Sequence, residues 1–227
     1  MTQGAPARVL RHTLAARLLH GAAVLAVALL LPTGLALGEM LPPGWVARLG
    51  GHAAASVGHD LLGLGFVGLA ALVLVVGHRG AGMLLRELGQ VRRADVVWLG
   101  AFLRDGAGRR PPRAWHAARL DPLQRWVIAV VLAALAALAV SGVVLYFAPA
   151  HWRWVFVVAV RAHALAGCVL MLALLVHAIA GLGVLPTHRG VARSMFGDGT
   201  VPLATARRLW PGWTTSRVAR HPPDTER

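Results

Sequence analysis

Two histidines stand inside one long apolar segment of the chain. His163 and His177 belong to the run RAHALAGCVLMLALLVHAIAGLG, which covers residues 161–183. In an α-helix a separation of 14 residues places them about 21 Å apart, just under four turns, on nearly the same stripe. Such a run is typical of a helix that crosses a hydrocarbon core of about 30 Å. Ionisable groups at these depths are costly and mark functional sites, so the pair indicates two metal centres or one proton path.

Four apolar blocks must position these histidines, at about 18–37, 59–77, 126–147 and 163–185. Hydrophobic residues make up 57% of the 227 residues and charged residues only 14%, which is the composition of a membrane protein. The first block is longer than the apolar core of a signal peptide, so we expect it to be retained as a span. We predict an all-α fold, with residues 1–227 forming a single integral membrane four-helix bundle.

The arginines predict the orientation of this bundle. All 23 basic residues are arginines, and 20 of them lie in the N-terminal arm, in the segment 78–125 or in the tail 186–227. This positive-inside pattern predicts that both termini are cytoplasmic, in a multi-pass protein of the bacterial inner membrane. Topology thus accounts for the net charge of +14, and we expect membrane lipid and no nucleic acid as a partner. The single cysteine, Cys168, excludes an intrachain disulfide and a Cys-based cluster within the chain.

The segments outside the spans predict little further structure. The run LLRELGQVRRADVVWLGAFLR, within 78–125, fits either a short amphipathic helix on an anionic membrane surface or a solvated basic loop. All eight tryptophans fall in loops or at the ends of spans, and we interpret them as an interfacial aromatic belt. We expect the tail after Pro186 to extend along the cytoplasmic face.

Matching depths across the spans groups four histidines into two layers. With a cytoplasmic N-terminus, His20 and His177 lie near the cytoplasmic side, whereas His59 and His163 lie near the outer side; the third span has no histidine. Haem iron accepts two axial imidazoles, and bundle cores build such sites from facing helices. The pattern therefore predicts two bis-histidine haems. Zinc fits less well, because histidine pairs without nearby acids or thiols do not complete its usual four ligands.

Some assignments have alternatives. His52 lies seven residues before His59, almost on the same helical face, and would serve as the ligand if the second helix began sooner. Depth favours His59. Arg17 and Arg161, each within three residues of a layer histidine, are candidate partners for haem propionates, although each also suits a topology-setting role. No C-x-x-C-H motif is present, so haem b is expected instead of haem c.

Short motifs over nearly the whole chain carry a family resemblance. They are R-L-L-H at 17–20, H-D-L-L-G at 59–63, RLDPLQRWVIAV at 119–130, SMFGDGTV at 194–201 and the spacing of His163 and His177. With these motifs the chain resembles the cytochrome b (gamma) subunit of membrane-bound formate dehydrogenases, within the wider dihaem b-type cytochrome family of hydrogenases and thiosulfate reductases. The resemblance implies an outer haem b on His59 and His163 and an inner haem b on His20 and His177.

The resemblance also implies a quinone site beside the inner haem, for menaquinone or ubiquinone. Asp121 and Gln124 occupy the matching positions, and Asp121 stands where the family usually has Asn. The implied function is electron transfer from the iron–sulfur (beta) subunit of a formate dehydrogenase, whose alpha subunit is catalytic, through two haems to quinone. The chain shows no group suited to molybdenum or formate, so we expect no residue catalytic for formate oxidation.

Two other functions stay open at this point. The chain could be the cytochrome b subunit of a hydrogenase or of another dehydrogenase. It could also be a haem-free transporter or membrane anchor that uses its histidines as a proton relay. The long basic segment 78–125 favours a dehydrogenase subunit over a small stand-alone cytochrome b561, in which we expect little sequence between the second and third spans.

Overall fold

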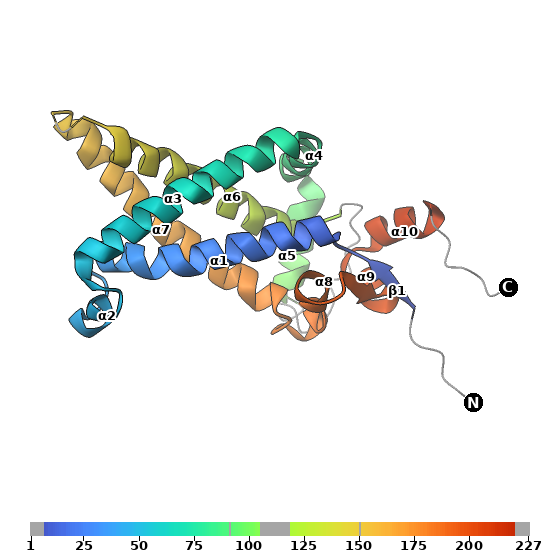
Figure 1. Cartoon of the computed structure of the whole chain (residues 1–227). Helices are drawn as coiled ribbons and strands as arrows, with labels where there is room; N and C mark the ends of the chain where they lie inside the picture. The colour runs from blue at the N-terminus through green and yellow to red at the C-terminus, as the bar shows by residue number, and fades with distance from the viewer. Residues whose placement is uncertain (1–6, 91, 105–118, 150, 221–227) are drawn as a thin grey trace. The chain divides into compact units, whose positions relative to one another are not determined.

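The computed structural model describes residues 7–90, 92–104, 119–149 and 151–220. Figure 1 labels its elements along the chain. Four helices are long and apolar enough to cross a membrane: α1 (Leu14–Leu37), α3 (Gly51–Val76), α6 (Pro122–Phe147) and α7 (Arg153–Gly181). The prediction of an all-α, multi-pass membrane protein is confirmed.

All four long helices begin before the predicted spans. α3 begins at Gly51 instead of 59, and α7 begins at Arg153 instead of 163. An apolar window marks only the part of a helix inside hydrocarbon, whereas the backbone hydrogen bonds continue through interfacial residues that the window excludes. His59 and His163 therefore lie two turns or more inside their helices and not at the first turn.

Helix α7 ends four residues before the predicted boundary because of a glycine. Gly183 adopts a φ of +78°, and Val184 donates its N–H to the carbonyl of Ile179 at 3.1 Å. Gly183 itself donates to the carbonyl of Ala180 at 3.2 Å. This is the Schellman arrangement, which glycine favours because it has no Cβ to clash in the left-handed region.

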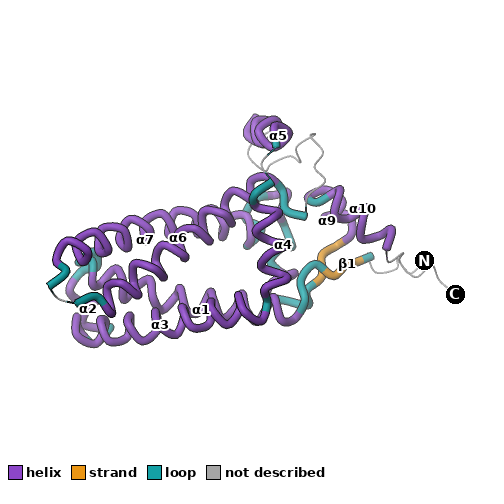
Figure 2. The backbone as a smooth tube through the Cα atoms, turned by 90° about the horizontal axis from the view of Figure 1, so that it is seen from above, coloured by secondary structure: helices purple, strands orange, loops and turns teal. Residues whose placement is uncertain are grey.

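The chain divides into two compact units, which are described separately. The span unit comprises Leu18–Met83 and Val130–Leu172, and the terminal unit comprises Met1–Arg17, Leu84–Ala129 and Ala173–Arg227. In the span unit, α2 (Pro43–Arg48) connects α1 to α3, and Val46 packs with Ala36 and Ala55 in a small buried cluster. Figure 2 shows the long helices of this unit as purple tubes, with α1 beside α3 and α6 beside α7.

The segment 78–125 contains two helices in its described part, α4 (His78–Leu88) and α5 (Arg93–Arg104). The helical alternative is thus confirmed, but with a break at Gly89 and Gln90 where one helix was considered. Within the terminal unit, Asp95 on α5 forms an ion pair with Arg125 at the start of α6. Both side chains are buried, so this pair anchors α5 to α6.

The tail is folded, although the sequence predicted little structure outside the spans. It forms a 3₁₀ turn (Pro186–His188), α8 (Arg193–Phe196), β2 (Thr200–Pro202), α9 (Leu203–Leu209) and α10 (Pro211–Arg220). Strand β1 (Arg8–Leu10) of the N-terminal arm pairs antiparallel with β2, with Val9 opposite Val201. A buried cluster that includes Val201 and Trp210 forms beneath this pairing. The tail folds because its scattered apolar residues suffice to build a small core with the arm.

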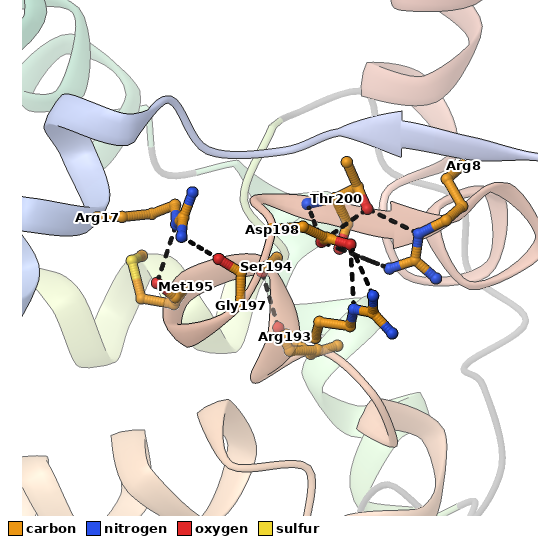
Figure 3. A network of polar contacts seen from close by, with 9 residues as sticks. Arg8, Arg17, Arg193, Ser194, Met195, Gly197, Asp198 and Thr200 are labelled. Atoms are coloured by element: carbon orange, nitrogen blue, oxygen red, sulfur yellow. Dashed lines mark hydrogen bonds and ion pairs between the residues drawn. The ribbon is translucent and has the colours of Figure 1, made fainter.

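The motif 194–201 holds the arm through polar contacts, drawn in Figure 3. Asp198 accepts hydrogen bonds from Arg193 and from the backbone and hydroxyl of Thr200, and it forms an ion pair with Arg8. Arg17 donates to the carbonyls of Met195 and Gly197. These hydrogen bonds and ion pairs give the motif a structural role in the terminal unit.

The tryptophans divide into two groups. Trp45, Trp126, Trp152 and Trp154 are exposed, as an interfacial belt requires. Trp98 and Trp210 are only 6% and 1% exposed, so the belt interpretation is wrong for these two. They belong to the packed interior of the terminal unit, which the hydropathy pattern did not indicate. Trp115 lies outside the described residues.

Candidate functional site

Two histidines of the predicted outer layer face each other inside the span unit. His59 on α3 and His163 on α7 have ring centroids 6.1 Å apart, with ring planes inclined at 74°. Both side chains are half-buried. The structure thus brings together the two residues that the sequence paired by depth.

Each of these imidazoles is held by a hydroxyl from a neighbouring helix. Nδ1 of His59 lies 3.0 Å from Oγ1 of Thr33 on α1, and Nδ1 of His163 lies 2.9 Å from Oγ of Ser141 on α6. All four long helices therefore contribute one residue to this layer. The two hydroxyls, which belong to helices other than those of the histidines, orient the two imidazole rings.

The other hydrogen bonds of each hydroxyl favour one tautomer of the imidazole beside it. Thr33 lies within hydrogen-bond distance of the carbonyls of Leu29 and Leu30, at 3.1 and 3.0 Å, and donates its single proton to them. With this donation its oxygen accepts a hydrogen bond from His59, in the tautomer whose proton is on Nδ1. Nε2 keeps a free lone pair, which is the form of imidazole that binds a metal.

The same argument applies to the second histidine. Ser141 donates to the carbonyl of Ala137 at 2.6 Å, with Leu138 at 3.3 Å. With this donation its oxygen accepts a hydrogen bond from Nδ1–H of His163, and in that tautomer Nε2 carries the lone pair.

A glycine of a neighbouring helix lies against each imidazole, and another glycine follows each histidine by one turn. A Cβ at Gly34 would be 3.1 Å from Cε1 of His59, and a Cβ at Gly142 would be 3.3 Å from Cε1 of His163. One turn after the histidines stand Gly63 and Gly167, where a Cβ would meet no atom closer than 4.0 Å. The first pair lets the rings pack against backbone, and the second leaves open space along the ligand helices.

The geometry fits a haem iron between the two rings. Two imidazole–metal bonds of about 2 Å, with about 1.1 Å from each nitrogen to its ring centre, place the centroids roughly 6 Å apart. The observed 6.1 Å agrees, and two planes inclined at 74° can both contain one axis. Within the described residues, no group of three or more His, Cys, Asp and Glu side chains could hold a bare metal ion. Two imidazoles at this separation, with glycines nearby, fit haem.

The predicted inner pair is distributed over the two units. His20 lies on α1 in the span unit, and His177 lies on α7 in the terminal unit; both are half-buried. Gly181 follows His177 by one turn, with open space at its Cβ position, as Gly167 follows His163. The pairing of His20 with His177 stays a prediction.

The other candidate residues near the layers are placed as follows. The second long helix does begin sooner than predicted, yet His52 is exposed in its first turn, and it is His59 whose ring lies against His163. Arg161 is exposed on α7. Arg17 is directed to the carbonyls of the tail motif in the terminal unit. The propionate roles of both arginines stay predictions.

Asp121 and Gln124 lie at the N-terminus of α6, in the terminal unit. Oδ1 of Asp121 accepts a hydrogen bond from the backbone N–H of Gln124 at 2.9 Å, so Asp121 is the N-cap of α6. Its other oxygen, Oδ2, is buried without a hydrogen-bond partner among the described residues. Burial raises the pKa of this carboxyl to about 6, partly opposed by the charge of Arg11.

A second group of residues surrounds this N-terminus. Oε1 of Gln124 accepts a hydrogen bond from Nε1 of Trp210 at 3.2 Å. The guanidinium of Arg11 lies 3.9 Å from the Trp210 ring centre and 4.5 Å from that of Trp213, and it donates to the carbonyl of Arg119 at 2.8 Å. Burial and the charge of Arg119 lower the pKa of Arg11 to about 9. A buried carboxyl and a buried guanidinium thus lie in one cluster.

A family model described as prokaryotic cytochrome b561 matches residues 11–198. The chain belongs to the prokaryotic cytochrome b561 family. It is therefore a membrane b-type cytochrome of a family that binds haem b and takes part in electron transfer. The matched range includes the segment 78–125. The chain matches no individually curated protein.

Sequence reasoning missed Thr33 and Ser141 as parts of the cytochrome site. Both are hydroxyl residues within apolar spans, and each is followed directly by a glycine. Polar side chains at membrane depth commonly hydrogen-bond across helices, which is the signal that could have identified them. It also missed Arg11 and Trp210, which the pattern could not distinguish from topology-setting and interfacial residues.

Proposed function

We propose that the chain is a membrane-anchoring dihaem cytochrome b subunit that transfers electrons to a membrane quinone. The observation that supports this most directly is the pair of neighbouring rings of His59 and His163, each with a hydroxyl beside its Nδ1. A bound haem supplies one-electron chemistry between ferric and ferrous iron. His59 and His163 hold the outer haem, and His20 and His177 hold the inner one.

Arginines and the shape of the span unit complete the haem sites in this proposal. Arg161, two residues before His163, and Arg17, three before His20, neutralise propionates at the two interfaces. Gly63, Gly167 and Gly181 leave room for the flat macrocycle beside the ligand helices. Large apolar side chains are exposed on the long helices, and in a bilayer they face hydrocarbon, which keeps water away from both sites.

In this proposal, the cluster of side chains at the start of α6 forms the quinone site. Quinone reduction consumes protons as well as electrons, and Asp121 can hold one at Oδ2, since its pKa is raised to about 6. Gln124 is oriented by Trp210 and can offer its amide to a quinone oxygen. Asp121 is also an N-cap, so its structural and chemical roles must be tested separately.

The electron donor is proposed to be the iron–sulfur subunit of a formate dehydrogenase, with its catalytic alpha subunit. The motifs at 119–130 and 194–201 support this donor. A hydrogenase or another dehydrogenase is the alternative within the same family. Co-expression of the chain with candidate partners, followed by affinity purification and quinone reduction with formate or hydrogen as donor, separates them: the proposal requires copurification and formate-dependent reduction.

Spectroscopy tests the haem assignment. The purified chain should show b-type bands in its reduced-minus-oxidised spectrum and two haems per chain. His59→Ala and His163→Ala should each remove one haem, and His177→Ala should remove the other together with quinone reduction. His52→Ala is the matched control and should retain both. A folded His59→Ala protein with two haems would exclude the outer pair, and a folded chain without b-type bands would favour the haem-free proton relay.

A further inference from the structure

We propose that Thr33 and Ser141 are paired positioning residues for the outer haem, and that their hydroxyls set its redox potential. This rests on the proposed ligation of that haem by His59 and His163. Neither hydroxyl touches the iron; each acts through the Nδ1 of one axial imidazole.

The same arrangement of a hydroxyl residue and a glycine against an imidazole occurs twice in the span unit. In each case a hydroxyl residue is followed directly by a glycine: Thr33 and Gly34 on α1, Ser141 and Gly142 on α6. The hydroxyl lies 3.0 or 2.9 Å from Nδ1, and the glycine backbone lies against Cε1 of the same ring. The imidazole is thus fixed at two adjacent ring atoms, which determines both its position and its rotation.

Each pair belongs to one helical hairpin. Thr33 supports His59 within the hairpin of α1 and α3, and Ser141 supports His163 within the hairpin of α6 and α7. Each half of the outer site therefore orients its own ligand, without help from the other half.

Packing alone does not account for these hydroxyls. Each already donates its proton to carbonyls of its own helix, so its hydrogen-bonding capacity as a donor is satisfied without the histidine. Each hydroxyl oxygen still has a lone pair that can accept a hydrogen bond from Nδ1–H of its histidine. A valine or alanine would fill the space, but it would leave the Nδ1–H of the histidine without this partner.

The chemical consequence concerns the strength of the ligand. An acceptor at Nδ1–H increases the basicity of Nε2, and outer partners of this kind typically contribute 10–100-fold to metal affinity. A more basic axial ligand stabilises ferric iron more than ferrous iron, and so lowers the reduction potential. Removal of either hydroxyl should raise the potential of the outer haem.

The experiment uses the His177→Ala background, in which the outer haem alone should remain. Thr33→Val and Ser141→Ala are compared with Thr33→Ser, which retains the hydroxyl, and with Ser56→Ala, which removes a different hydroxyl from α3. The readouts are the midpoint potential from a redox titration and the rate of haem transfer to a haem-binding acceptor protein.

We expect Thr33→Val and Ser141→Ala to raise the midpoint potential, by about 59 mV for each tenfold loss of preference for ferric iron. Haem loss should be about 10–100-fold faster, following the lost affinity. Thr33→Ser and Ser56→Ala should stay close to the parent. Unchanged potentials in both hydroxyl-deleted variants, or equal shifts in Thr33→Val and Thr33→Ser, would overturn the proposal.

Failure of the ligation itself is distinguishable from failure of this proposal. If the parent with His177→Ala keeps its haem after His59→Ala, the ligand assignment is wrong and the hydroxyls are not involved. If Thr33→Val does not fold, Ser141→Ala on α6 provides an independent test of the same effect.

Discussion

A Cβ on Gly142 would lie 3.3 Å from Cε1 of His163, tighter than ordinary van der Waals contact. The ring can therefore keep its place only while residue 142 has no side chain. Gly142→Ala should push the imidazole by a few tenths of an ångström and weaken its bond to Ser141, because hydrogen bonds depend steeply on geometry.

The measurement is the low-spin ferric EPR spectrum of the outer haem, which should change in g values while the inner signal stays constant. Gly65→Ala is the control, since a Cβ there would meet nothing within 4 Å. An unchanged outer signal in Gly142→Ala would mean that the ring is not held as tightly as the structure indicates.

Gly167→Leu should exclude haem without disturbing the protein. Residue 167 lies one turn after His163, and a Cβ there would meet open space. A leucine is also a better helix former than glycine by roughly 0.5–1 kcal/mol, so the fold should persist. Haem analysis and circular dichroism should show one haem per chain with unchanged helix content. Two haems per chain would show that the face of α7 with residue 167 does not line the outer haem site.

Asp121→Asn should change the pH dependence of stability. The carboxyl pKa rises from 3.8 to about 6 on folding, so between these values the folded state binds more protons than the unfolded state. The stability of the wild type therefore falls as pH rises from about 4 to about 6, by up to about 3 kcal/mol, and stays lower above it. Asparagine can also act as the N-cap of α6, and its side chain does not titrate. The variant should therefore not lose stability as the pH rises.

Thermal unfolding of the detergent-solubilised protein, followed by tryptophan fluorescence, tests this. The difference between Asp121→Asn and the wild type should be near zero at pH 4 and positive at pH 8. A difference that does not vary with pH would place the titrating group elsewhere. Loss of quinone reduction in the same stable variant would separate the chemical role of Asp121 from its capping role.

Asp95→Asn should destabilise the terminal unit strongly. Asp95 and Arg125 form an ion pair in which both side chains are at most 7% exposed. Removal of one partner leaves a buried charge uncompensated, which typically costs 3–5 kcal/mol. The double variant Asp95→Leu with Arg125→Met should recover much of this loss, because no buried charge remains. Denaturation of the wild type, Asp95→Leu, Arg125→Met and the double variant gives the coupling energy, and additivity of the two single effects would contradict it.

The pairing of His59 with His163 was accessible from sequence because it needs only two regularities. Hydropathy locates each span, and arginine placement gives its direction, so the depth of a histidine follows from its position in the span. Because α3 begins at Gly51, His52 could have been the partner of His163. The ring beside His163 is nevertheless that of His59, the residue that depth favoured. The inner pair, by the same logic, stays a prediction.

The hydrogen-bond partners of these histidines, Thr33 and Ser141, could not be predicted from the sequence, because these contacts depend on the rotation of each helix about its axis. Which face of α1 is turned to α3 decides whether Thr33 reaches His59, and a uniformly apolar span carries no pattern that fixes this. The terminal unit escaped prediction for a different reason. Its core joins residues close to both ends of the chain, and local patterns do not indicate contacts of such separation.

Strand β1 also constrains the order in which the protein can be completed. Arg8 and Thr200 are 192 residues apart in sequence, yet they are hydrogen-bonded. During synthesis the N-terminal arm leaves the ribosome first, and its partner strand emerges only after all four long helices have been made. The arm must therefore remain without its strand partner until the four long helices have been made, and the terminal unit of this cytochrome cannot close before that.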